Sequence, residues 1–435
     1  LLAYVAPKDV TEPEEVALEL SRALSVDAGE ILAKLSDRDD PFEIIKRKLS
    51  DDEVARVREL KLGGVALLSE KYRYYPADTL ASHIVGFSSL SERGGAGGYG
   101  IEASFDDVLR GFSSRMEQER DAGGRWIALS NTRGHGPNHG DNLILTIDRV
   151  IQHETEKILK EVIEKHSADS ATAIVMDPET GKILSMATQP DFNPNEYAQA
   201  EDYSVFLNPA LSLPYEPGSI MKPFTMAIGI DEKKVSPTTE YTDTGAVTES
   251  GYTVRNSEDK VYGRSSMTKV LEDSINTGMI FVERQVGHKV FAERLRRFGF
   301  GEKTGIDLPA EAAGNLHNLD DQRIGIQFYT ASFGQGITAT PLQITAAYAA
   351  LANGGMLMRP QIVDAIEYPD GTREEVKPEE VRRVISKETS ATIGRMLRSV
   401  VVNGHGKRAD VAGYEVVGKT GMAQVAKTDV KGYEE

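Results

Sequence analysis

A serine lies three residues before a lysine at Ser219 and Lys222, within the stretch from Glu216 to Pro223. On a helix, residues three apart share one face, so these two side chains can meet. A serine hydroxyl is a weak nucleophile, and a lysine whose pKa is lowered by burial can serve as its base. Gly218 permits a sharp turn just before the serine, which would place backbone N–H groups of a helix N-terminus near an oxyanion. The pair therefore predicts a serine nucleophile activated by a lysine.

Two further short motifs follow in chain order. Ser274 and Asn276 form a Ser-x-Asn motif, and residues 419–421 have the sequence Lys-Thr-Gly. Taken singly, each is weak evidence, because Ser274 could be an ordinary helix cap and Lys419 a solvated lysine at a strand edge. All three motifs in this order form the motif set of serine acyltransferases that recognise penicillin.

With these motifs the chain resembles the class B penicillin-binding proteins, which are monofunctional peptidoglycan D,D-transpeptidases. The resemblance covers nearly the whole chain. It also rests on segments outside the three motifs: residues 74–76, 83–87, 99–102, 304–309, 333–336, 340–343 and 353–355. Residues 74–76 and the short connection at 87–102 look more like those of the division-type and sporulation-type members, by analogy.

The resemblance implies a catalytic role for four residues. Ser219 attacks the carbonyl of the penultimate D-alanine in a peptidoglycan stem peptide ending in D-Ala-D-Ala. Lys222, kept neutral by burial and by nearby positive charge, accepts the hydroxyl proton. Ser274 passes a proton to the departing D-alanine, and Asn276 orients Lys222 and holds the substrate amide. A stem-peptide amine then takes the acyl group, and β-lactams acylate Ser219 in the same way.

The resemblance assigns substrate binding to the third motif and the residue after it. Lys419 and the Thr420 hydroxyl bind the terminal carboxylate, and Gly421 lets the substrate backbone approach closely. The backbone N–H groups of Ser219 and Met422 form the oxyanion hole. The family commonly has threonine where this chain has Met422. A backbone N–H serves whatever the side chain, so we expect catalysis to survive, with weaker binding of β-lactams that would use that hydroxyl.

The expected architecture has two domains. Residues 1–140 would form an N-terminal α+β pedestal of the dimerisation type, with helices at 11–24, 27–35 and 41–62. Thr11 and Glu14 fit a capping box at the first of these helices.

Residues 141–435 would form the transpeptidase domain, an α/β fold of the penicillin-binding transpeptidase and serine β-lactamase type. It has helices on both faces of a mostly antiparallel sheet, and the site lies in a cleft beside that sheet. The sequence predicts a strand at 142–147, a helix at 148–165, a hairpin of 172–176 with 182–187, and a strand at 416–419.

The ends of the chain carry two further expectations. Residues 422–435 follow the third motif and are too few to complete the family's sheet, so we expect its C-terminal strands and helix to be lacking. No apolar run approaches roughly 18 to 20 residues, and the N-terminal anchor usual in the family is expected to be absent from this chain. The expected location is the extracytoplasmic face of the bacterial cell membrane.

The amino-acid composition limits the kinds of binding partner that we expect. The formal charge of −17 argues against nucleic acid. There is no cysteine, and His135 and His139 lie in a Gly/Pro-rich stretch without a third ligand nearby, so we expect neither a metal nor a cofactor. The chain has no glycosyltransferase region. We therefore expect it to work beside a separate glycan polymerase of the SEDS (shape, elongation, division and sporulation) type.

Two alternatives remain open. The first is a β-lactam hydrolase or D,D-carboxypeptidase, in which water accepts the acyl group. Glu311 and Asn315 have the spacing of the deacylating loop of class A β-lactamases, although the segment from Asp307 also resembles transpeptidases. The second is a β-lactam sensor or a scaffold that retains the fold for partner contacts.

Overall fold

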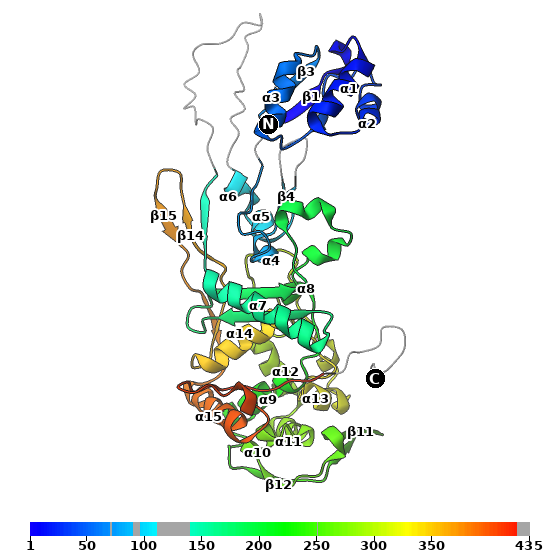
Figure 1. The fold of residues 1–435 in the computed structure, drawn as a ribbon. Helices are drawn as coiled ribbons and strands as arrows, with labels where there is room; N and C mark the ends of the chain where they lie inside the picture. Colours follow the sequence, from blue (N-terminus) through cyan, green and yellow to red (C-terminus); the bar gives the residue numbers. More distant parts are fainter. Residues whose placement is uncertain (70–71, 90–95, 111–139, 250, 424–435) are drawn as a thin grey trace, which may run out of the picture. The chain divides into compact units, whose positions relative to one another are not determined.

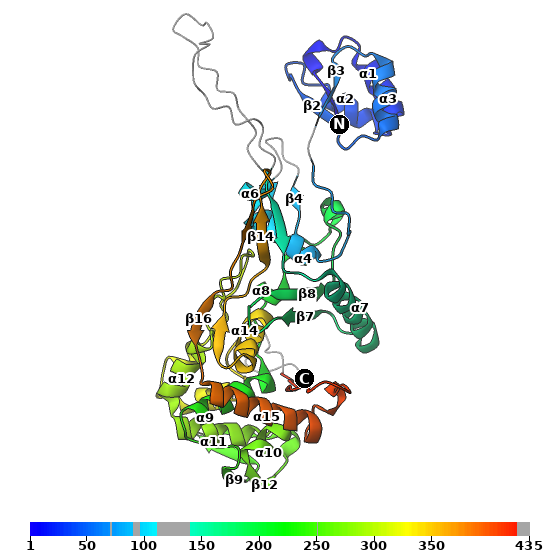
Figure 2. The same cartoon turned by 90° about the vertical axis from the view of Figure 1, so that its left-hand side faces the viewer.

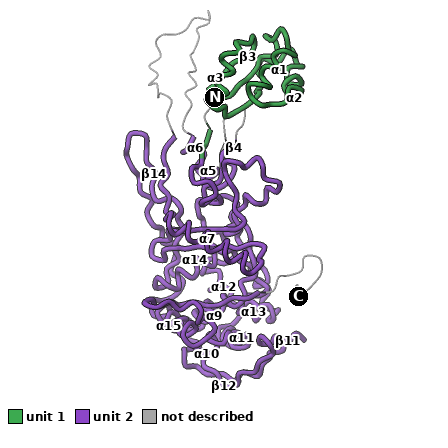
Figure 3. The backbone as a smooth tube through the Cα atoms, in the orientation of Figure 1, with its two compact units in different colours: residues 1–74 green, residues 75–435 purple. Residues whose placement is uncertain are grey.

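The computed structural model describes residues 1–69, 72–89, 96–110, 140–249 and 251–423. The chain divides into two compact units, residues 1–74 and residues 75–435 (Figure 3). The predicted domain boundary at residue 140 follows a stretch outside the described ranges and stays a prediction. The Gly/Pro-rich stretch that contains His135 and His139 lies outside the described residues.

The first unit is a small sheet packed against helices (Figure 1). Its central strand pairs antiparallel with both neighbours, and a buried apolar cluster lies between the sheet and the helices. In chain order the elements are β1 (Leu2–Val5), α1 (Pro13–Leu24), α2 (Ala28–Lys34), β2 (Glu43–Lys46), α3 (Asp51–Leu60) and β3 (Val65–Leu68).

Two details of this unit differ from the sequence prediction. The predicted helix at 41–62 is wrong in its first part, because residues 43–46 pair with β1 as strand β2. The helix proper begins after Ser50, which forms a capping box with Glu53. At α1 no side-chain cap forms, since Pro13 occupies the first helical position and makes Glu12 the N-cap.

In the second unit, short elements precede a sheet assembled from distant segments. These elements are α4 (Ser82–Val85), β4 (Ser88–Ser89) paired with β5 (Ala96–Gly97), α5 (Gly100–Ser104) and α6 (Asp106–Arg110). Strand β6 (Asn142–Leu145) then pairs with β14 (Val363–Glu367), which also pairs with β15 (Arg373–Glu375). Figures 1 and 2 both show β14 beside β6, the teal strand.

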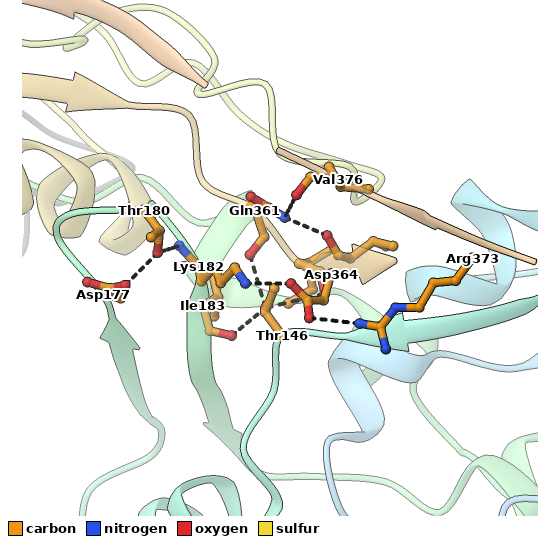
Figure 4. A network of polar contacts seen from close by, with 11 residues as sticks. Thr146, Asp177, Thr180, Lys182, Ile183, Gln361, Asp364, Arg373 and Val376 are labelled. Atoms are coloured by element: carbon orange, nitrogen blue, oxygen red, sulfur yellow. Dashed lines mark hydrogen bonds and ion pairs between the residues drawn. The ribbon is translucent and has the colours of Figure 1, made fainter. Parts of the chain in front are cut away.

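A polar network ties this sheet to the next layer (Figure 4). The Thr146 hydroxyl lies 2.6 Å from the carbonyl oxygen of Ile183 and 3.1 Å from that of Gln361. The Lys182 ammonium donates to Asp364 at 2.5 Å. The segment after β6 is thereby joined to the start of β8 and to the segment that enters β14.

The core of the second unit begins with a hairpin between helices. Strands β7 (Ala171–Met176) and β8 (Ile183–Gln189) pair antiparallel, α7 (Arg149–His166) packs on β8, and α14 (Pro341–Ala352) packs on β7 (Figure 2). Asp148 caps α7 by accepting from the N–H groups of Val150 and Ile151. The predicted helix and hairpin are confirmed, and β6 confirms the predicted strand at 142–147 in its first four residues.

Most of the remaining helices surround a large apolar cluster. They are α9 (Lys222–Asp231), α10 (Met267–Glu272), α11 (Asn276–Val286), α12 (His288–Arg297), α13 (Gly325–Ala331) and α15 (Lys387–Asn403). The short helix α8 (Pro209–Ser212) packs in a separate cluster. Helix α9 runs through the centre, and its residues 222–229 are all buried. None of the helices in the part of the chain that the structure describes is long and apolar enough to cross a membrane.

Short ladders complete the fold. They are β9 (Glu240–Asp243) with β12 (Gly263–Ser266), β10 (Ala246–Glu249) with β11 (Tyr252–Arg255), and β13 (Met356–Met358) with β16 (Glu380–Arg383). The predicted strand at 416–419 is wrong: these residues belong to no ladder. A β-branched run reaches strand geometry through a pairing partner, and none of the described strands pairs with it.

Candidate active site

The candidate nucleophile lies on a tight turn that runs directly into a helix. Residues Gly218–Met221 form a single 3-10 turn, and α9 begins at the next residue, Lys222. Gly218 has a φ of +57°, a left-handed conformation that a side chain makes costly. The half-buried Ser219 therefore sits where a backbone turn ends and a buried helix begins.

The lysine of the first motif is wholly buried. Its ammonium nitrogen lies 2.5 Å from the Ser274 carbonyl oxygen, 3.0 Å from the Ser274 hydroxyl and 2.8 Å from Asn276 Oδ1. Burial lowers the pKa of Lys222 well below its ordinary value, and the positive charge of Lys419 lowers it further. In the neutral form the amine has two hydrogens, enough for the Ser274 carbonyl and Asn276 Oδ1, and one lone pair for a hydroxyl proton.

The second motif is held in place by its own backbone. Ser274 has a φ of +55°, uncommon for a serine, and lies between α10 and α11. Asn276 opens α11, and its amide nitrogen donates to the carbonyl oxygen of Arg255 at 3.0 Å. Both ends of the Asn276 amide are thus used, one by Lys222 and one by Arg255.

The third motif lies against the nucleophile turn. A Cβ added at Gly218 would come within 2.4 Å of the Met422 carbonyl oxygen, and one added at Gly421 within 2.6 Å of the Ile220 side chain. Thr420 and Met422 are exposed, and Lys419 is half-buried. Burial lowers the pKa of Lys419 to about 8. Without these two glycines the segments could not approach so closely.

The structure brings the predicted site residues to one place. Ser274 and Asn276 contact the buried amine of Lys222, and Ser219 lies on the turn that leads into the same helix. Residues 419–422 lie against that turn. Among the described residues, no hydrogen bond joins the Ser219 hydroxyl to the Lys222 nitrogen, a common situation for catalytic pairs without substrate. Within the described ranges, no group of three His, Asp or Glu side chains is placed to hold a metal ion.

Three supporting contacts escaped the sequence reasoning. The Gly218 N–H donates to the Gly334 carbonyl oxygen at 2.9 Å, and the Gly336 N–H donates to the Glu216 carboxylate at 2.9 Å. The Tyr348 hydroxyl donates to the Ile220 carbonyl oxygen at 2.8 Å. In the sequence, residues 333–336 stand out only through the family resemblance. The signal that could have revealed the contact is the pair of glycines, Gly334 and Gly336, which in the structure both have positive φ.

Glu311 is occupied within its own loop. One carboxylate oxygen accepts from the Thr304 N–H at 2.7 Å and lies 2.6 Å from the Thr304 hydroxyl, and the other accepts from the Gly305 N–H at 3.2 Å. The side chain is buried. These contacts give Glu311 a structural use that does not involve the Ser219 turn.

Two protein-family models and several known proteins match this chain. Residues 171–435 match the penicillin-binding protein transpeptidase domain, and residues 2–145 match the penicillin-binding protein dimerisation domain. The stage V sporulation protein D of Bacillus subtilis is 34% identical over 433 residues, which cover 98% of this chain and 66% of that protein. The peptidoglycan D,D-transpeptidase FtsI of Escherichia coli is 28% identical over 98% of this chain and 70% of its own length.

A solved structure supports the same comparison. The crystal structure of penicillin-binding protein 3 from Mycobacterium tuberculosis in complex with ampicillin has a TM-score of 0.74 and is 32% identical, covering 84% of this chain and 78% of that one. The chain spans a little under two thirds of the length of the sporulation protein.

Proposed function

Since this chain belongs to the penicillin-binding proteins that combine a transpeptidase domain with a dimerisation domain, we propose that it is a serine-type peptidoglycan D,D-transpeptidase. The observation that carries the proposal is the buried Lys222 amine. It is held by Ser274 and Asn276 one turn after Ser219, where its pKa is lowered. A neutral amine in that position is a base for a serine hydroxyl.

In the acylation step the Ser219 hydroxyl oxygen attacks the carbonyl of the penultimate D-alanine, and its proton passes to Lys222. The C–N bond to the terminal D-alanine then breaks, and its nitrogen receives a proton through the Ser274 hydroxyl. That hydroxyl lies 3.0 Å from the Lys222 nitrogen, so it can hand on the proton that the amine has received. The product is an ester on Ser219 and free D-alanine.

Substrate recognition falls to the third motif. Lys419 and Thr420 bind the terminal carboxylate, and Gly421 leaves room for the substrate backbone. The backbone N–H groups of Ser219 and Met422 receive the oxyanion, which suits the close approach of Met422 to Gly218. An amine from a neighbouring stem peptide then attacks the ester and completes the cross-link. A β-lactam would open on Ser219 in the same way.

Water as the acyl acceptor is less favoured. The Glu311 carboxylate that would activate it is buried and engaged by Thr304 and Gly305. We further propose that the protein acts at the extracytoplasmic face of the membrane, beside a SEDS-type glycan polymerase. A sensor would form the same acyl-enzyme and use it to signal rather than to cross-link.

The test is intact-protein mass spectrometry over time with benzylpenicillin, with Ser219→Ala measured alongside. We expect a lasting mass increase of one penicilloyl group in the parent protein and none in the variant. Consumption of the drug without a lasting adduct would make water the acceptor and favour a hydrolase. An intact drug and an unmodified protein would contradict the proposal.

A further inference from the structure

A buried carboxylate lies just outside the proposed catalytic residues. Asp243 ends β9 and is 2% exposed. One of its oxygens accepts from the Gly245 N–H at 3.0 Å and the Thr277 hydroxyl at 2.6 Å. The other accepts from the Tyr262 N–H at 2.7 Å and the Asn256 side-chain amide at 2.9 Å. A buried charge with four donors is well compensated, and its geometry is tightly fixed.

One arm of this network reaches the start of α11. Thr277 directly follows Asn276, and its hydroxyl donates to Asp243. Its backbone N–H donates to Asn256 Oδ1 at 3.1 Å, and Tyr241 Oη lies 3.2 Å from its hydroxyl oxygen. The first turn of α11 is therefore fixed by the β9 segment and by Asn256.

The second arm reaches the acceptor on the other side. Asn256 is held by Asp243 and directly follows Arg255, whose carbonyl oxygen accepts from the Asn276 amide nitrogen at 3.0 Å. The two arms close a ring. Thr277, which follows Asn276, and Asn256, which follows Arg255, both donate to the Asp243 carboxylate. Asn276 is held between these two arms, and its oxygen accepts from Lys222.

We infer that Asp243 is a positioning residue for acylation. Through Thr277 and Asn256 it fixes the Asn276 amide, and the amide in turn fixes the Lys222 amine relative to Ser219. This inference rests on the proposed function. The hydrogen bonds of Asp243 to described residues involve neither the Lys222 amine nor the proposed carboxylate-binding motif at 419–421. Both ends of the Asn276 amide are engaged by Lys222 and the Arg255 carbonyl, so the loss of Asp243 should slow the chemical step much more than it weakens the noncovalent affinity for a β-lactam.

The network also keeps Asp243 charged. Hydrogen bonds from Thr277, Tyr262, Gly245 and Asn256 outweigh the effect of burial and lower the pKa of its carboxyl. An asparagine at this position would turn an amide N–H₂ toward a pair of donors. Asp243→Asn thus disturbs the ring with little change in side-chain volume.

The experiment measures the acylation kinetics of the whole chain with a fluorescent penicillin, resolving the dissociation constant from the first-order acylation constant. For Asp243→Asn we expect the acylation constant to fall on the order of tenfold or more, as for a small misplacement of a reacting group. For Thr277→Val, which loses the hydroxyl alone, we expect roughly a three- to tenfold fall, and Thr277→Ser should restore the rate to within about twofold.

A matched control is Glu240→Gln on the same strand, whose carboxylate is exposed and pairs with exposed Arg264. It should acylate at the parental rate. The melting temperature of each variant is recorded. If Asp243→Asn does not fold, the comparison of Thr277→Val with Thr277→Ser tests the inference.

Three results would overturn the inference. The first is parental acylation constants in both Asp243→Asn and Thr277→Val, whatever their melting temperatures. The second is a loss confined to the dissociation constant, and the third is Thr277→Ser as slow as Thr277→Val. A parent protein that is not acylated at all would refute the proposed function itself.

Discussion

The loop formed by residues 333–336 should control the nucleophile turn, and Gly334→Ala tests this. Gly334 has a φ of +90°, and its carbonyl oxygen accepts from the Gly218 N–H. An added Cβ would lie 2.1 Å from the Gly218 carbonyl oxygen and 2.6 Å from its nitrogen. Ordinary contact begins near 3.4 Å, so the two backbones must separate by about 1.3 Å. Backbone atoms cannot rotate away as a side chain can.

The magnitude follows from two separate costs. The left-handed conformation costs an alanine about 1–2 kcal/mol, and the forced separation costs about 1–3 kcal/mol more. Gly334→Ala should therefore lower the free energy of unfolding by roughly 2–5 kcal/mol. Since a shift of about 1 Å near the reacting atoms can cost a hundredfold in rate, we expect acylation of Ser219 to fall by about that factor.

Gly371→Ala is the matched control. Gly371 has a φ of +83° with nothing within 4 Å of the added Cβ, so it carries the conformational cost without the clash. Chemical denaturation and acylation by a fluorescent penicillin are measured for both variants. If Gly334→Ala acylates as fast as Gly371→Ala, contact between this loop and Gly218 does not position the nucleophile.

Three further outcomes are expected. Acylation should slow as pH falls through the lowered pKa of Lys222, because protonation removes the base. The affinity for a β-lactam should weaken above about pH 8, where Lys419 loses its charge. Acylation rates and affinities that do not change with pH would contradict both expectations. Met422→Thr should raise acylation by cephalosporins more than turnover of a stem peptide, and equal effects would argue against a hydroxyl contact. Glu311→Gln should cost about 1–3 kcal/mol in unfolding free energy, by loosening Thr304, and leave deacylation of the penicilloyl-enzyme unchanged. Slower deacylation would restore the hydrolase alternative, because Glu311 would then act as the base for water.

The parts of the fold that could be predicted depend on local signals. The hairpin of β7 and β8 follows from two apolar runs around a turn whose Asp177 and Gly181 have the right chemistry, and α7 from the cap at Asp148. The segments 43–46 and 416–419 depend on pairing partners instead. Residues 43–46 pair with β1, whereas residues 416–419 have no partner among the described strands. The composition of these segments therefore does not decide whether they form strands.

The site shows the same division. Spacing along the chain predicts a site at Ser219 and Lys222, and the order of the motifs adds Ser274, Asn276 and the third motif to that prediction. Spacing could not reveal the left-handed conformation of Ser274, because it belongs to the C-terminal end of α10, where the Ile275 N–H donates to the Val270 carbonyl oxygen. Asp243 and Thr277, like Gly334 and Gly218, are far apart in sequence, and spacing along the chain cannot show that either pair is in contact.

The pairing of β6 with β14 sets the order in which the molecule can assemble. Thr146, next to β6, and Ile362, next to β14, are 216 residues apart. At ordinary rates of synthesis, β6 exists for about 10 to 40 s before its partner does. Closing so long a loop costs chain entropy that local pairing does not, so this sheet should form late. Until then β6 presents an unsatisfied strand edge, which leaves it open to wrong pairing during biogenesis.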